Sequence, residues 1–193
     1  MISGKKFIAI VPARIGSKRL KMKNLKEFNG KPLFLWSMMS AKKSKYIDRI
    51  YLSTDSKKIN TIAFKNGFKI YNLRSKKLST DKTTSSELIL NIFSRIKEKF
   101  DFFILLQPTS PLRQSTDIDY AIKRIVQKNK KSLVSVNAKN NQNNGAIYIQ
   151  NISFFKKNKK FRYKNSMIYK MPAKKSIDID TKKDFDQALK YCL

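Results

Sequence analysis

Histidine is absent from this chain of 193 residues. Its absence excludes catalysis by a Ser-His-Asp triad, general-base chemistry by histidine, and metal sites built on imidazole. Any reaction must therefore use carboxylates, lysine, arginine, hydroxyl groups or a metal ion held by oxygen atoms.

Cysteine and long apolar runs are equally scarce. The one cysteine, Cys192, cannot form a disulfide within the chain, which favours a reducing compartment. No apolar run is long enough to cross a membrane, and residues 1–6 lack the apolar core of a signal peptide. We therefore expect a soluble, cytoplasmic protein.

Acidic residues are few, with 13 Asp and Glu against 43 Lys and Arg, which gives a formal net charge of +30. Such an excess can indicate nucleic-acid binding, but no zinc finger, basic zipper or RNA-recognition signature accompanies it. The lysines are spread over nearly every segment, beside Asn and Ile, which also fits a genome-wide preference for A/T-rich codons. Charge of this kind is weak support for a specific function.

Apolar strand-like runs alternate with helical patterns along the chain. Strands are predicted at residues 7–11, 48–53, 68–73, 102–106, 133–136 and 146–149, with shorter ones at 167–169 and 177–179. Helices are predicted at about 33–43, 56–66, 85–99, 117–128 and 181–191. This alternation is typical of βαβ units, so we expect one α/β domain over residues 1–193, with a mostly parallel central sheet and helices on both faces.

Polar clusters follow directly after the predicted strands, at residues 14–24, 54–55, 107–113 and 178–180. In a parallel sheet these strand ends share one edge, so the clusters are expected to converge on one crevice. The crevice does not belong to a P-loop ATPase or a Rossmann dehydrogenase, because residues 11–24 match neither GxxxxGK[ST] nor GxGxxG.

The first cluster is a basic loop. It contains five cationic side chains and no acidic residue: Arg14, Lys18, Arg19, Lys21 and Lys23. Cations held this close repel each other, so a polyanion such as a triphosphate would stabilise the loop. From charge alone, a solvated run in a Lys-rich protein is an equal alternative.

The two later clusters suggest a polar site and a cation site. In QPTSPLR, at residues 107–113, two prolines make a rigid turn that can present Gln107, Thr109 and Ser110 to a base or sugar. An ordinary turn that caps the next helix is the alternative. In Asp178-Ile179-Asp180, the strand period places both carboxylates on one face, where Mg²⁺ could join them to phosphate oxygens. The alternative is that Asp180 caps the helix after it.

Taken together, the motifs resemble those of the acylneuraminate (sialic acid-type) cytidylyltransferases. ARIGSK at residues 13–18, followed by Lys23-Asn24, matches their ARxGSK…KN signature, and QPTSPLR is unchanged. NGAIYI at 144–149, SIDIDT at 176–181, STD at 53–55 and LSTD at 78–81 also match, in the same order. The resemblance spans about residues 7–191.

The resemblance implies a three-layer, Rossmann-like nucleotidyltransferase fold. It also implies transfer of CMP from CTP to the anomeric hydroxyl of a 2-keto sugar acid, with release of pyrophosphate and with Mg²⁺ as cofactor, in cell-surface polysaccharide biosynthesis. QPTSPLR favours a nine-carbon nonulosonic acid over the 3-deoxy-manno-octulosonate of related enzymes.

The resemblance also assigns roles residue by residue. Arg14, Lys18 and Lys23 would bind the triphosphate, with Asn24 assisting, whereas Arg19 and Lys21 are attributed to the Lys-rich composition. The cytosine and ribose would contact Arg74, Ser85, Gln107, Thr109 and Ser110, with Asn144 at the ribose or sugar edge. Asp178 and Asp180 would bind the metal, and Asp180 would also assist deprotonation of the attacking hydroxyl. The expected catalytic residues are therefore Arg14, Lys18, Lys23 and Asp180.

The sequence departs from the family at residues 137–144. The family has a longer segment there, with a hairpin arm used in dimerisation and residues that contact the sugar from the partner subunit. Only residues 137–143 remain here, so we expect a homodimer with a reduced or altered interface. A CTP-binding homologue without activity, a basic nucleic-acid-binding protein and a DxD glycosyltransferase stay open as alternatives.

Overall fold

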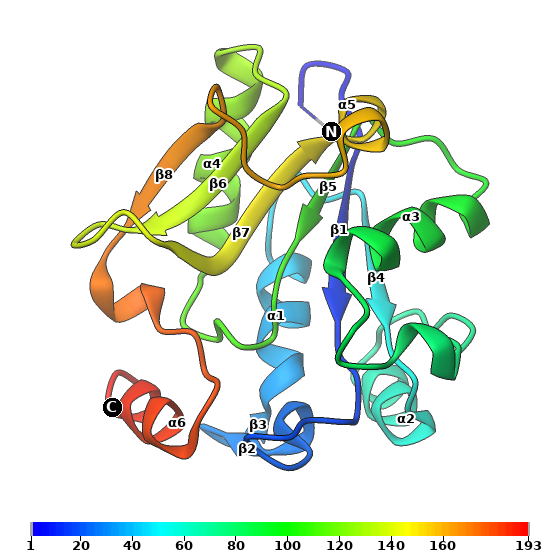
Figure 1. Cartoon of the computed structure of the whole chain (residues 1–193), viewed down its shortest axis with the longest axis vertical. Helices are drawn as coiled ribbons and strands as arrows, with labels where there is room; N and C mark the ends of the chain where they lie inside the picture. Colours follow the sequence, from blue (N-terminus) through cyan, green and yellow to red (C-terminus); the bar gives the residue numbers. More distant parts are fainter. Residues whose placement is uncertain (1, 193) are drawn as a thin grey trace.

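In a computed structural model that describes residues 2–192, a six-stranded sheet runs through the centre of the molecule (Figure 1). Its strand order is β4-β1-β5-β7-β6-β8. The strands are β1 (Phe7–Pro12), β4 (Arg49–Ser53), β5 (Phe102–Leu105), β6 (Ser132–Asn137), β7 (Asn143–Asn151) and β8 (Met167–Met171). β1 pairs in parallel with β4 and β5, and β6 pairs in parallel with β8, whereas β7 runs antiparallel to β5 and β6. The prediction of a mostly parallel sheet is confirmed.

Helices cover both faces of this sheet because its strands are apolar on both sides. On one face, Phe7, Ala9 and Val11 of β1 pack in a core with α1 (Leu33–Lys42), α2 (Lys57–Lys65) and α4 (Ser115–Gln127). On the other, Ile8 and Ile10 pack with α3 (Ser85–Arg95) and α5 (Ile152–Asn158). Strand residues that alternate between the two cores give the three-layer arrangement that the resemblance implied.

A third apolar cluster seats the C-terminal helix α6 (Lys182–Leu189). Phe185 and Ala188 pack there against Phe28 and Leu33, beside a small hairpin of β2 (Glu27–Phe28) and β3 (Lys31–Pro32). A capping box begins α6: Thr181 Oγ1 accepts from the Asp184 backbone N–H, and the Asp184 carboxylate accepts from the Thr181 backbone N–H. The short 3₁₀ helices are η1 (Lys23–Leu25), η2 (Lys76–Leu78) and η3 (Ala173–Ser176).

Two predicted strands are wrong. Residues 68–73 form no strand, because side chains hold the backbone there: Asn60 Nδ2 donates to the carbonyl oxygen of Tyr71, and the Tyr71 ring stacks on Tyr51. Residues 177–179 also form no strand, and the Ile179 N–H instead donates to the carbonyl oxygen of Thr109. The prediction also missed α5 and placed the end of α3 at residue 99 instead of Arg95.

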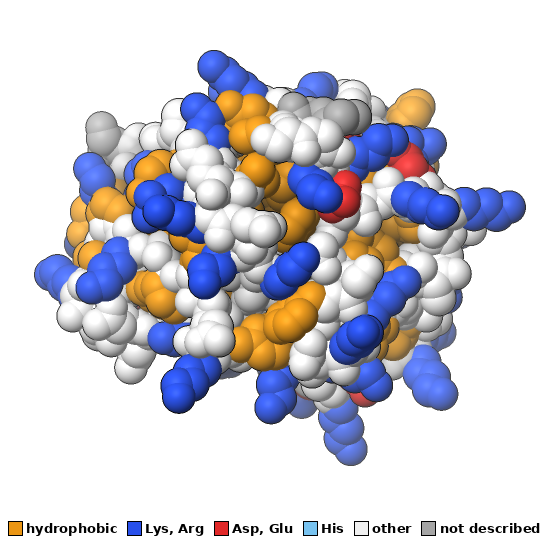
Figure 2. All heavy atoms as spheres, turned by 90° about the horizontal axis from the view of Figure 1, so that it is seen from above, with side chains coloured by type: hydrophobic (Ala, Val, Ile, Leu, Met, Phe, Trp, Pro, Cys, Tyr) orange, Lys and Arg blue, Asp and Glu red, His pale blue; other side chains and the backbone are white. Residues whose placement is uncertain are grey.

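A short turn at residues 138–142 joins β6 directly to β7. Asn141 adopts the left-handed backbone conformation that closes the turn, with φ of 56°. Over the described residues, the helices are too short or too polar to cross a membrane. Lys and Arg side chains are scattered over the face shown in Figure 2 and do not gather into one patch.

Candidate active site

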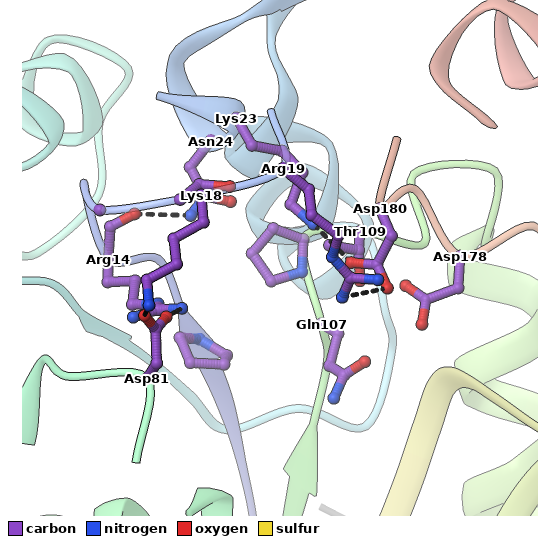
Figure 3. Close-up of a pocket in the computed structure, with 14 residues that line it drawn as sticks. Arg14, Lys18, Arg19, Lys23, Asn24, Asp81, Gln107, Thr109, Asp178 and Asp180 are labelled. Carbon is purple, nitrogen blue, oxygen red and sulfur yellow. Dashed lines mark hydrogen bonds and ion pairs between the residues drawn. The ribbon is translucent and has the colours of Figure 1, made fainter. Parts of the chain in front are cut away.

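A cavity of about 480 Å³ opens where β1 and β5 end at their carboxyl edge. Its wall combines the loop after β1, the turn after β5, the segment before α3 and the segment before α6 (Figure 3). The lining residues are Pro12, Arg14, Gly16, Ser17, Lys18, Arg19, Lys23, Asn24, Asp81, Gln107, Pro108, Thr109, Asp178 and Asp180. Three of the four predicted polar clusters therefore converge on one site.

The fourth cluster fixes the base of the basic loop. Asp55 Oδ1 accepts from the Ile15 N–H at 2.8 Å, immediately after Arg14. Asn24 Nδ2 donates to the carbonyl oxygen of Arg14 at 2.8 Å, which ties the two ends of the loop together. Asp55 and the buried Asn24 therefore hold the loop in shape, and Asn24 also lines the cavity.

Two carboxylates from distant segments each bridge two cations of the basic loop. Asp81 pairs with Arg14 and with Lys18, whose Nζ lies 2.9 Å from Asp81 Oδ2. Asp180 pairs with Arg19 at 2.8 Å and with Lys23 at 2.9 Å. Figure 3 shows these as two separate groups, one on each side of the site. The sequence interpretation gave no cavity role to Asp81 or Arg19, because neither pairing is visible from local spacing.

Three carboxylates line this cavity, and Asp178 is the one that forms no ion pair with any residue in the range 2–192. Its side chain is exposed to solvent and lines the cavity. Desolvation by the cavity wall is the main cause that raises its pKa. The charge of Asp180 raises the pKa further, while a hydrogen bond from Thr109 lowers it. A cation next to Asp178 would relieve this cost.

The donor set at this point fits a hard divalent cation. Among the described residues, no group of three or more His, Cys, Asp or Glu side chains forms a complete protein metal site. Asp178 and Asp180 nevertheless line the same cavity as the lysines and arginines, and Mg²⁺ commonly takes one or two carboxylates with phosphate oxygens and water.

Gly145 gives the side chain of Gln107 its place in the cavity. Gly145 has φ of +71°, and a Cβ there would lie 2.4 Å from Gln107 Oε1 and 3.5 Å from Asp178 Oδ2. Any other residue would therefore push Gln107 aside and strain the backbone. The glycine stands in the NGAIYI motif, but the sequence interpretation assigned it no role.

A second cavity, of about 160 Å³, holds Arg74 and Ser85 and shares Pro12, Arg14 and Asp81 with the first. Arg74 Nε donates to Ser79 Oγ at 3.2 Å, whereas its buried Nη2 has no hydrogen-bond partner within residues 2–192. Burial lowers the pKa of Arg74. A guanidinium with a spare donor at a cavity wall can bind a carbonyl oxygen of a ligand.

Ser110 and Asn144 do not line either cavity, unlike the other predicted site residues. Ser110 Oγ is fully buried and donates to the carbonyl oxygen of Asn144. Asn144 Oδ1 accepts from Ser135 Oγ at 2.6 Å, and its Nδ2 donates to Ser176 Oγ at 2.9 Å. Their polar atoms are used inside the protein in this structure, where they support the turn and β7, so their contact with a nucleotide stays a prediction.

The QPTSPLR turn is anchored by its last residue, the buried Arg113. Arg113 is 3% exposed and donates to the carbonyl oxygen of Ala146 at 2.6 Å and to Ser37 Oγ at 2.5 Å. Burial lowers its pKa to about 9. The arginine therefore joins the turn to β7 and α1, and Gln107 and Thr109 are presented from a fixed base.

Comparisons with known proteins agree with this geometry. The cytidylyltransferase family model matches residues 8–192. An N-acylneuraminate cytidylyltransferase of Escherichia coli is 34% identical over 217 residues, covering 95% of this chain and 51% of that protein. A CMP-N,N'-diacetyllegionaminic acid synthase of Legionella pneumophila is 37% identical over 134 residues, covering 68% of this chain and 57% of that protein. The chain thus spans little more than half the length of these curated relatives.

Solved structures show the same fold. A CMP:2-keto-3-deoxy-manno-octonic acid synthetase complexed with CTP superposes with a TM-score of 0.75 at 14% identity, over 97% of this chain and 98% of that one. A 4-diphosphocytidyl-2C-methyl-D-erythritol synthase from Anaerococcus prevotii gives 0.72, also at 14% identity, over 99% and 97%. Because the family model matches residues 8–192 of its 193 residues, the chain belongs to the cytidylyltransferase family.

Proposed function

We propose that this protein transfers CMP from CTP to a nonulosonic, sialic acid-like sugar acid and releases pyrophosphate. The observation that carries the proposal is the single cavity in which four loop cations face a pair of aspartates. Relatives that are N-acylneuraminate, legionaminic acid and pseudaminic acid enzymes support the acceptor class.

The cations supply what this reaction needs most. Transfer of a nucleotidyl group depends on neutralising phosphate charge and aligning the attacking and leaving oxygens, more than on covalent catalysis. Arg14, Lys18 and Lys23 line the larger cavity and would hold the triphosphate, whereas Arg74 and Ser85 in the smaller cavity would hold the base. Arg19 lies against Asp180, and we add it to this set.

We also propose Mg²⁺ as the cofactor, held by Asp178 and Asp180 together with phosphate oxygens. When bound, the metal would neutralise charge on the phosphates. The acceptor oxygen forms a bond to the α-phosphorus while the bond from that phosphorus to pyrophosphate breaks, and the hydroxyl proton passes to a carboxylate. The expected acceptor is Asp180, which pairs with Lys23 and Arg19 in the protein without substrate.

The proposed setting is the cytoplasm, and the proposed assembly is a homodimer with an interface altered from that of the longer relatives. The short turn at residues 138–142 supports the altered interface, because it leaves no room for a dimerisation arm. Light scattering of the purified protein tests the assembly, and a monomer at working concentration would contradict it.

The activity is tested by pyrophosphate release with CTP, Mg²⁺ and a panel of nonulosonic acids. We expect turnover that needs all three components and that falls by about 100-fold or more in Asp180→Ala and in Lys23→Ala. Lys182→Ala, an exposed lysine outside the cavity, is the matched control and should keep full activity. Binding of CTP without turnover of any acid in the panel would instead identify a homologue without activity.

A further inference from the structure

The ion pair of Arg14 and Asp81 stands between the two cavities. Both residues line the larger cavity and both line the smaller one, together with Pro12. A nucleoside triphosphate with its base in one cavity and its phosphates in the other must pass this pair. The ion pair therefore lies between the proposed binding sites of the base and of the phosphates, where the bound ligand would contact it.

Asp81 holds the two cations with one short side chain. Its Oδ2 lies 2.9 Å from Lys18 Nζ and its Oδ1 accepts from Arg14 Nη2, while Arg14 Nη1 reaches the carbonyl oxygen of Ser79 in the same segment. Asp81 is 41% exposed and Lys18 is 85% exposed. Exposed pairs of this kind are weak, so a ligand of higher charge can replace the carboxylate.

Arg14 and Lys18 cannot keep their ion pairs with Asp81 and at the same time bind a triphosphate with the same N–H groups. A triphosphate oxygen near these cations is repelled by the Asp81 carboxylate, because both carry negative charge and would lie a few ångströms apart. The carboxylate therefore competes with phosphate oxygens for the same donors.

We propose that Asp81 is an intramolecular competitor of the phosphates: it holds Arg14 and Lys18 in the empty protein, is displaced by a bound triphosphate, and returns to them as pyrophosphate leaves. The proposal rests on the nucleotide site described above. It assigns to Asp81 the control of triphosphate affinity and of pyrophosphate release, with no part in bond formation.

The test measures binding of three probes without metal, by calorimetry at fixed ionic strength: inorganic tripolyphosphate, CTP and cytidine. In Asp81→Asn, we expect tripolyphosphate and CTP to bind about fivefold more tightly than in the wild type, because two exposed ion pairs no longer have to be broken. Cytidine, which lacks phosphates, should change by less than about twofold.

Asp186→Asn is the matched control. Asp186 is an exposed aspartate that pairs with Lys182 on α6, so this change removes the same charge away from the cavity. It should leave all three affinities as in the wild type. Asp81→Glu should restore the wild-type affinity for tripolyphosphate.

A double-mutant cycle separates competition at the site from general attraction to a basic protein. When Lys18 alone is changed to Met, which leaves Arg14 to bind phosphate, the gain from Asp81→Asn should shrink, since one of the two donors in dispute is gone. Equal or weaker binding of tripolyphosphate by Asp81→Asn in the wild-type background would overturn the proposal and show that Asp81 instead positions the cations for phosphate.

Turnover gives a second readout. Asp81→Asn should lower the inhibition constant of pyrophosphate and the KM for CTP together, whereas a merely structural loss would raise both. If no sugar acid is turned over, the proposed activity fails, but the tripolyphosphate measurement still decides the role of Asp81.

Discussion

Asp178 is a residue whose surroundings oppose its charge. It lies on a concave wall, next to Asp180, and its neighbours raise its pKa. Such a residue is retained at a cost in stability, which is common where function needs an unfavourable group. Asp180, on the same wall, is held by Lys23 and Arg19. Substitution by asparagine should therefore change the melting temperature in different ways at Asp178 and at Asp180.

We predict that Asp178→Asn raises the melting temperature at pH 7 by about 1–2 °C and reduces pyrophosphate release by about 100-fold. The gain should shrink as the pH falls. Because the folded-state pKa of Asp178 is raised, the native protein binds its proton more readily than the unfolded chain, so the wild type regains this stability in acid.

Calorimetric scans of both proteins between pH 4 and 7 check the prediction, with Asp180→Asn as the comparison. Asp180→Asn should not raise the melting temperature, since it leaves Lys23 and Arg19 without a counter-ion. A lower melting temperature for Asp178→Asn at pH 7 would contradict this account of Asp178.

At the scale of elements, the QPTSPLR turn is a rigid support for the site. Its last residue, Arg113, contacts β7 through Ala146 and α1 through Ser37. The amide of Ile179 also donates to the Thr109 carbonyl, so the segment with Asp178 and Asp180 is tied to the same turn. A substitution of Arg113 should therefore shift both the residues proposed to bind the base and the pair Asp178 and Asp180.

We predict that Arg113→Lys lowers the free energy of unfolding by about 2–3 kcal/mol and weakens CTP binding severalfold. Lysine cannot reproduce the fork of donors, so buried oxygen atoms lose their partners. Urea unfolding and calorimetry measure the two effects. Arg124→Lys, on the exposed side of α4, is the control and should change neither, and an unaltered Arg113→Lys protein would show that the turn stands without this support.

The sequence predicted the site best for those residues whose position follows from the strand topology alone. Because parallel strands end at one edge, the clusters after β1 and β5 had to meet, and they do. The sequence could not predict that Asp81 and Asp180 each bridge two loop cations, because the ion pairs link residues about 65 and 160 positions apart. The strand predicted at 68–73 failed because its alternating pattern reflects packing against β4 and α2 without a hydrogen-bonded ladder.

At the scale of the whole molecule, the net charge is +30, and on the face shown in Figure 2 the lysines and arginines are scattered. Of the lysines and arginines of the chain, the cavity uses only Arg14, Lys18, Arg19 and Lys23. A diffuse charge attracts any polyanion weakly, whereas the cavity is built from cations that carboxylates hold in place.

We therefore predict that a duplex DNA binds this protein only at low salt, and that Arg14→Met together with Lys18→Met changes this binding by less than about twofold while nearly abolishing CTP binding. Fluorescence anisotropy between about 50 and 500 mM NaCl checks the first part, and calorimetry the second. DNA binding that survives the highest salt, or that is lost with the two substitutions, would favour a nucleic-acid-binding protein.

The antiparallel direction of β7 determines where extra residues can be inserted without disturbing the sheet. Because β7 runs against its neighbours, the turn at residues 138–142 opens on the same edge of the sheet as the cavity, just before Asn144 and Gly145. Extra chain inserted in this turn would emerge beside the cavity while every strand keeps its neighbours. The hairpin is thus a natural grafting point, at which an engineered loop could be given contacts to a new acceptor without redesigning the sheet.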